Sequence, residues 1–188
     1  MAKRNSEGKA PEGEVATLEI KKIRDKVETL LKQSRISKPP VPVQKIAENL
    51  GLDVRYAPFE GDLSGALVRG DGEAYIGVNS LHHPNRQRFS IAHELGHYML
   101  HKGMKVHVDK DFHVNWRDDD SSKAINRDEI EANRFAAELL MPTRFLVRDI
   151  EELKSVNQEI AHTLAKRYKV SSQAMRIRLG NFGFIVPE

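Results

Sequence analysis

Residues 88–101 read RFSIAHELGHYMLH. This stretch holds an H-E-x-x-H motif, from His93 to His97, among apolar residues spaced as on one face of a helix. Residues four apart on a helix share a face, with Cβ atoms about 5–6 Å apart, so both imidazoles can point at one ion. Glu94 is expected to reach the same cavity and to take a proton from metal-bound water. The motif therefore indicates a zinc hydrolase with Glu94 as its catalytic base.

The composition limits the other possibilities. The 188 residues suit one compact domain with an appended element or two. There is no cysteine, so a bound metal must use histidine and carboxylate ligands, and a reducing cytosol is compatible with the chain. No apolar run is long enough to span a membrane, and residues 1–14 lack the apolar core of a signal peptide, so we expect a cytoplasmic protein. The net charge of +3 does not by itself indicate nucleic-acid binding.

Hydrophobic periodicity and turn residues predict an α+β fold. The expected helices are 17–34, 42–50, 84–101, 127–141, 145–153, 157–168 and 171–179. A strand is expected over 52–56, and strands 65–69 and 73–78 flank the turn signal Gly70-Asp71-Gly72, which predicts a hairpin. The stretch 106–122 is compatible with a strand and a loop, without a firm placement.

A catalytic zinc ion takes three protein ligands, so a third must join the two motif histidines. His101 continues their spacing, but it lies two helical turns, about 12 Å, from His93, too far for both to bind one ion. We expect His101 to interact with the last carbonyls of its helix instead.

The helix expected over 127–141 offers the alternative, a carboxylate ligand. Glu129 shares a stripe with alanines that would allow close approach to the motif helix, whereas Glu131 lies on a more polar face. Glu129 is therefore the favoured ligand. Asn133, one turn later on the same stripe, can hydrogen-bond a ligand histidine and fix its orientation.

These motifs resemble the ImmA/IrrE family of metallopeptidases. The resemblance covers roughly residues 40–180 and implies a zincin-like core with zinc held by His93, His97 and Glu129, and with Glu94 as general base. Members of this family characteristically cut helix-turn-helix transcriptional repressors, so such a repressor is the implied protein substrate. The chain departs from the family in a longer spacer between His97 and Glu129 and in an extra N-terminal helix. The segments that carry the resemblance are Arg86 to His97, Glu129 to Pro142, Ile76 to Ser80, Trp116-Arg117, Ser121-Ser122 and Ile46 to Gly51.

The predicted organisation has four parts. A flexible tail covers residues 1–14 and an N-terminal helix covers 15–38. The zincin-like metallopeptidase core, with a small antiparallel sheet and the motif helix, covers 39–142, and a helical, helix-turn-helix-like region covers 143–188.

The sequence also gives expectations about how the substrate and the developing oxyanion are bound. We expect the substrate to add as a strand to the backbone edge of the hairpin that precedes the motif helix. A donor to the developing oxyanion should lie near the metal, and the candidates are His107, His113 and Tyr98, among which the sequence does not choose.

A DNA-binding regulator is the competing class of function. Residues 160–180 resemble a helix-turn-helix whose second helix carries Gln173, Arg176 and Arg178, as a unit that reads a groove would. Met175, Ile177 and Leu179 are equally compatible with packing, so DNA binding is possible but not favoured. A third alternative is a metal-bound interaction protein with little peptidase turnover, which cleavage of a cognate repressor would distinguish.

Overall fold

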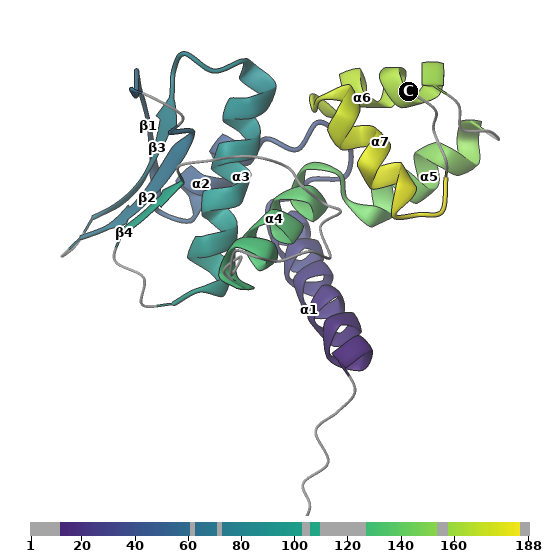
Figure 1. Cartoon of the computed structure of the whole chain (residues 1–188), viewed down its shortest axis with the longest axis horizontal. Helices are drawn as coiled ribbons and strands as arrows, with labels where there is room; N and C mark the ends of the chain where they lie inside the picture. The colour runs from purple at the N-terminus through teal and green to yellow at the C-terminus, as the bar shows by residue number, and fades with distance from the viewer. Residues whose placement is uncertain are drawn as a thin grey trace, which may run out of the picture.

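The structure is a computed structural model that describes residues 12–60, 63–70, 73–102, 106–109, 127–153 and 158–184 (Figure 1). The α+β class is confirmed. α1 begins at Glu12, so residues 12–14, which were expected in the tail, are helical. The elements of the described part are, in chain order, α1 (Glu12–Gln33), α2 (Val43–Asn49), β1 (Asp53–Ala57), β2 (Gly65–Arg69), β3 (Ala74–Asn79), α3 (Pro84–Leu100), β4 (Val106–Asp109), α4 (Arg127–Leu140), α5 (Thr143–Leu153), α6 (Gln158–Tyr168) and α7 (Ser172–Gly180).

The sheet has the strand order β1-β3-β2-β4 and is mixed, so the prediction of an antiparallel sheet is wrong in part. β2 and β3 form the expected antiparallel hairpin, and β4 pairs antiparallel with the other side of β2. β1 pairs in parallel with β3, with Asp53 opposite Tyr75 and Ala57 opposite Asn79. The parallel pair arises because the connection from β1 to β2 carries the chain past the position that β3 later takes. Both strands of the hairpin are therefore interior, and neither offers the free edge that was expected to receive a substrate.

α3 lies between the sheet and α4, and small residues allow the contacts on both sides (Figure 1). On the sheet side, a Cβ added to Gly65 of β2 would lie 3.2 Å from the Cβ of Ser90. On the other side, a Cβ added to Gly96 would lie 2.9 Å from the Cα of Ala132 in α4, closer than real Cβ atoms approach. The backbones of α3 and α4 therefore meet at the alanine stripe that the sequence predicted.

α2 packs against α3 and β1, and the other helices lie next to α4. α1 packs against it, and α5, α6 and α7 form a group on the side of α4 away from the sheet (Figure 1). A single hydrophobic cluster joins these layers, because buried side chains of every group belong to it, among them Val27, Leu31, Ile76, Leu95, Phe135, Phe145, Leu164 and Met175. No helix in the described ranges has the length and apolar character needed to cross a membrane.

Two buried polar networks hold the α5–α7 group. Asp149, which is fully buried, accepts a 2.7 Å hydrogen bond from the Tyr168 hydroxyl and lies within 3.3 Å of Arg148 and Arg167 nitrogens. Burial, together with the hydrogen bond to Asp149, raises the pKa of Tyr168 well above its usual range. These contacts pin α6 to α5.

The second network fixes α7. Arg178 donates to the Met141 carbonyl, to the Thr143 hydroxyl and to the Glu138 carboxylate, and only 12% of its side chain is exposed. Glu138 in turn accepts from the Thr143 backbone N–H, which satisfies the start of α5. Arg178 is thus a structural link between α7 and the α4–α5 junction and is not displayed for reading DNA.

Candidate functional site

α3 turns its motif residues toward the interior of the protein. His93, Glu94 and His97 are all fully buried. At the C-terminal end of the helix, Arg69 of β2 donates to the His97 carbonyl at 3.0 Å and to the His101 carbonyl at 3.1 Å. The expectation that the His101 side chain would interact with the last carbonyls of its helix is wrong, because its Nδ1 contacts His97 Nδ1 and its Nε2 faces the Glu131 carboxylate.

His93, His97 and Glu129 bring three potential ligand atoms together where α3 meets α4. The Nε2 atoms of the two histidines are 3.0 Å apart, and the Glu129 carboxylate oxygens lie 3.3 Å and 3.2 Å from them. Ligand atoms about 2.0–2.1 Å from a tetrahedral zinc ion are about 3.3–3.4 Å from one another. The spacing therefore fits one face of a zinc site, and the nitrogen and oxygen donors are those that zinc accepts in a chain without cysteine.

The contact between His93 and Asn133 defines the protonation of the His93 ring. Nδ1 of His93 lies 3.0 Å from Oδ1 of Asn133. A carbonyl oxygen can only accept, so Nδ1 carries the ring proton and Nε2 presents a lone pair toward the cluster. This is the tautomer that a metal ligand requires. Of the two histidines left open for Asn133 by the sequence, the structure selects His93.

His97 has a different neighbour, His101, one turn further along α3. Their Nδ1 atoms are 3.1 Å apart. Nε2 of His101 lies 3.4 Å from a carboxylate oxygen of Glu131 and 3.6 Å from one of Asp128. Glu131, the rival to Glu129 as third ligand, therefore faces His101, outside the cluster of three.

Glu94 lies between α3 and the beginning of β2. A Cβ added to Gly65 would stand 3.3 Å from Oε1 of Glu94, so the strand passes directly over this carboxylate. The absence of a side chain at Gly65 leaves room for the Glu94 carboxylate between α3 and β2. A carboxylate next in sequence to a metal ligand is the kind of group that can accept a proton from metal-bound water.

The three candidate oxyanion donors fall in different places. Tyr98 lies under the guanidinium of Arg69, whose Cζ is 4.9 Å from the ring centroid, and thus belongs to the contact between α3 and β2. His107 lies in β4, opposite Leu67 of β2. His113 lies outside the described residues.

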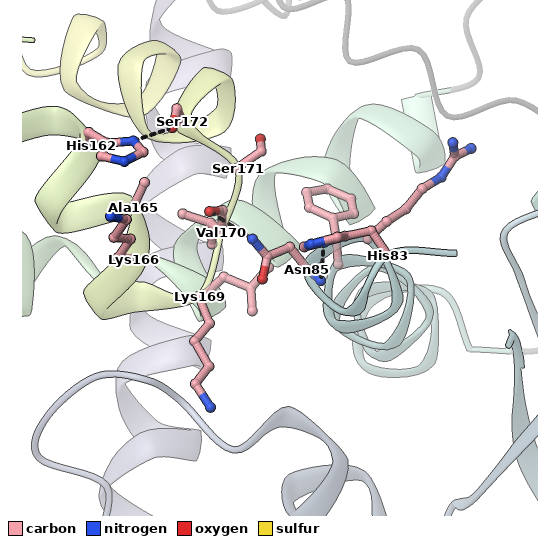
Figure 2. A pocket seen from close by; sticks show the side chains of 12 residues that line it. His83, Asn85, His162, Ala165, Lys166, Lys169, Val170, Ser171 and Ser172 are labelled. Carbon is pink, nitrogen blue, oxygen red and sulfur yellow. Dashed lines mark hydrogen bonds between the residues drawn. The ribbon is translucent and has the colours of Figure 1, made fainter. Parts of the chain in front are cut away.

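A pocket of about 690 Å³ opens between the beginning of α3 and the α6–α7 turn (Figure 2). Asn85 closes one wall by donating to the Val170 carbonyl, and His162 contacts the Ser172 hydroxyl on the other. Phe89 lines the pocket and also stacks on His93, with ring centroids 6.4 Å apart. The pocket therefore adjoins the cluster through one aromatic ring. Within the part of the chain that the structure describes, no carboxylate lines this pocket. Its basic side chains are His83, Arg86, His162, Lys166 and Lys169.

Comparison with known proteins places this geometry in a family. Residues 47–180 match the model of the Peptidase_M78 family, described as the IrrE N-terminal-like domain. The uncharacterized immunity region protein 2 of Bacillus phage phi105 is 27% identical over 149 residues, which cover 74% of this chain and 87% of the phage protein. A solved Mycobacterium tuberculosis transcriptional regulator shares the fold, with a TM-score of 0.56 and 20% identity, over 84% of this chain. The chain spans only 46% of that regulator's length. On the family match, this chain belongs to the Peptidase_M78 family, and the resemblance to ImmA/IrrE proteins is confirmed.

Proposed function

We propose that the protein is a zinc-dependent endopeptidase that cleaves a helix-turn-helix transcriptional repressor. The observation that carries the proposal is the convergence of His93, His97 and Glu129 at zinc-ligand spacing, with Glu94 buried in the same helix next to His93. Membership of a peptidase family supports the same chemistry.

Each residue of the site has its own role in the proposed peptide hydrolysis. Bound zinc would lower the pKa of a water molecule to about 7 and polarise the scissile carbonyl. Glu94 accepts the proton of the attacking water and returns it to the leaving amine. Asn133 holds the His93 ring in the tautomer that leaves Nε2 free, and so orients it.

The substrate is proposed to add to the outer edge of β4. The two hairpin strands are already paired on both sides, so an extended peptide cannot add to either. β4 runs beside β2, with Asp109 opposite Gly65, the residue that lies over Ser90 and Glu94. A peptide on the outer edge of β4 would gain main-chain hydrogen bonds on the side of the sheet that carries the catalytic carboxylate.

The repressor as substrate class rests on the family and on two relatives. One relative is named as an immunity region protein of a phage, and the other as a transcriptional regulator. Both names point to gene control, as does the repressor cleavage that the ImmA/IrrE resemblance implies.

Co-expression with the regulator encoded beside the gene tests the proposal. The regulator carries tags at both ends, so that cleavage gives two fragments, and a reporter gene measures derepression. The Glu94→Gln variant is expected to abolish both the fragments and derepression, while Glu152→Gln, an exposed α5 change of the same chemistry, leaves both unchanged. Full derepression by Glu94→Gln without cleavage would show that the protein acts by binding.

A further inference from the structure

His101 occupies a position that the proposed peptidase mechanism does not use. Its side chain is 10% exposed and lies between His97 on its own helix and two carboxylates of α4. It is too far along the helix to share an ion with His93. Its contacts nevertheless determine how His97 can be protonated.

The ring protons can be followed from atom to atom. For His97 to offer Nε2 to a metal, its ring proton must be on Nδ1, which then donates to Nδ1 of His101. His101 must accept there, so its own proton is on Nε2, which faces the Glu131 and Asp128 carboxylates. The opposite arrangement has His101 donating to His97, and it would place a proton on His97 Nε2, in the middle of the cluster, where it excludes a metal.

We propose that His101 is a positioning residue for the zinc site, and that Glu131 and Asp128 set its tautomer. The Glu131 carboxylate accepts from His101 Nε2–H and the Asp128 carboxylate lies close to the same N–H, so together they favour the one arrangement of neutral rings in which His97 presents a lone pair to the ion. His101 does for His97 what Asn133 does for His93. The inference rests on the proposed zinc site and extends it to α4 residues that bind no metal.

Zinc affinity measured by chelator competition tests this role without reference to peptidase activity. His101→Asn and His101→Leu have nearly the same shape, but only asparagine offers an oxygen close to the position of Nδ1. Loss of a hydrogen-bond partner of a metal ligand typically weakens metal binding about 10–100-fold. We expect a loss of that size for His101→Leu and a largely restored affinity for His101→Asn, with equal thermal stability of the two metal-free variants.

A second variant covers the case in which His101→Leu does not fold. Asp128→Ala combined with Glu131→Ala removes the acceptor of the His101 proton and the carboxylate beside it, at positions near the surface, and should weaken zinc binding several-fold with all three histidines intact. Wild-type affinity in this double variant, or in a folded His101→Leu protein, would overturn the inference and leave the proposed function standing. A wild-type protein that binds no zinc would overturn both.

Discussion

The α5–α7 group and the α3–α4 junction both bury polar side chains, but they arrange charge in opposite ways. Among the described residues, the buried carboxylates in and beside the α5–α7 group face cations, since Asp149 of α5 meets Arg167 at 3.3 Å and Glu138, near the end of α4, meets Arg178 of α7. In such a network the charges of the buried carboxylates are balanced by arginines of the same chain. Its exposed parts are the outer faces of the arginines, and its effect is to fix one helix on another.

At the α3–α4 junction the acceptors face one another. The Nε2 atoms of His93 and His97 and the carboxylate of Glu129 point to a common centre, while the ring proton of His93 points outward to Asn133. A cation at the centre would complete this arrangement. The direction in which the polar hydrogens point therefore distinguishes a ligand cluster from a structural ion pair more clearly than burial does.

The change at Glu94 is expected to have the greatest effect, on the rate of peptide cleavage and not on zinc binding. Glu94→Gln should lower the rate of repressor cleavage about 10²–10⁴-fold, because the amide cannot take the proton of water. Zinc content should remain unchanged, since Glu94 is outside the cluster of three. Cleavage by purified protein and metal analysis of the same sample measure both. Wild-type cleavage rates in this variant would break the assignment of Glu94 as base.

The next prediction compares the effects of Glu129 and Glu131, two glutamates of α4, on zinc affinity. Glu129→Gln should weaken zinc binding by about 100-fold or more, since a ligand carboxylate is lost. Glu131→Gln should cost tenfold or less, because its amide oxygen can still accept from His101. Chelator competition compares them. The reverse order would mean that the other face of α4 supplies the ligand.

A third prediction concerns stability in the α5–α7 group. Asp149→Ala should lower the free energy of unfolding by about 2 kcal/mol, since it leaves the buried Tyr168 hydroxyl without its acceptor. Tyr168→Phe should cost about 1 kcal/mol. Neither change should alter zinc affinity. Urea unfolding measures the first effect, and a zinc affinity that fell with stability would show that the two regions are coupled.

The Tyr168 contribution should also depend on pH in one direction. Folding raises the pKa of this hydroxyl, so its contribution is fully present below the ordinary tyrosine pKa of about 10 and is lost as the pH rises above it. The stability difference between wild type and Tyr168→Phe should therefore be constant at neutral pH and shrink above about pH 10. A difference that grew with alkaline pH would contradict the buried hydrogen bond.

Changes at the exposed residues of α7 are expected to have the least effect on cleavage and on stability. Gln173 is exposed and Arg176 partly so, whereas Met175 and Leu179 are buried in the core. Gln173→Ala with Arg176→Ala should leave both cleavage and fold unchanged. Tight, sequence-selective DNA binding that weakens steeply with salt and is lost in this variant would reverse our preference.

The sequence predicted the site best where one helix determines the geometry. The spacing of His93 and His97, the small-residue face of α4 and the choice of Glu129 over Glu131 as the residue nearest the histidines all follow from helical periodicity. Strands β1, β2 and β3 were likewise predicted from alternation and turn residues.

The contacts that the sequence did not reveal are those between elements distant in the chain. The parallel pairing of β1 with β3, and β4 as the fourth strand, depend on how connections cross the sheet, which periodicity does not record. Arg69 reaches the end of α3 from a neighbouring strand. The spacing of His101 was a visible signal, but its meaning depends on the carboxylates of α4 opposite it.

Because the three potential ligand atoms come from two helices, metal binding would be part of the folding equilibrium. α3 supplies two of them and α4 the third, and the lack of a side chain at Gly96 lets α4 come close at Ala132. An ion that binds only the docked pair stabilises it in proportion to the logarithm of its concentration, by about 2.7 kcal/mol at a hundred times the dissociation constant. The melting temperature would then report the supply of free metal, so that a cell poor in zinc would hold a less stable, more easily degraded form of the protein.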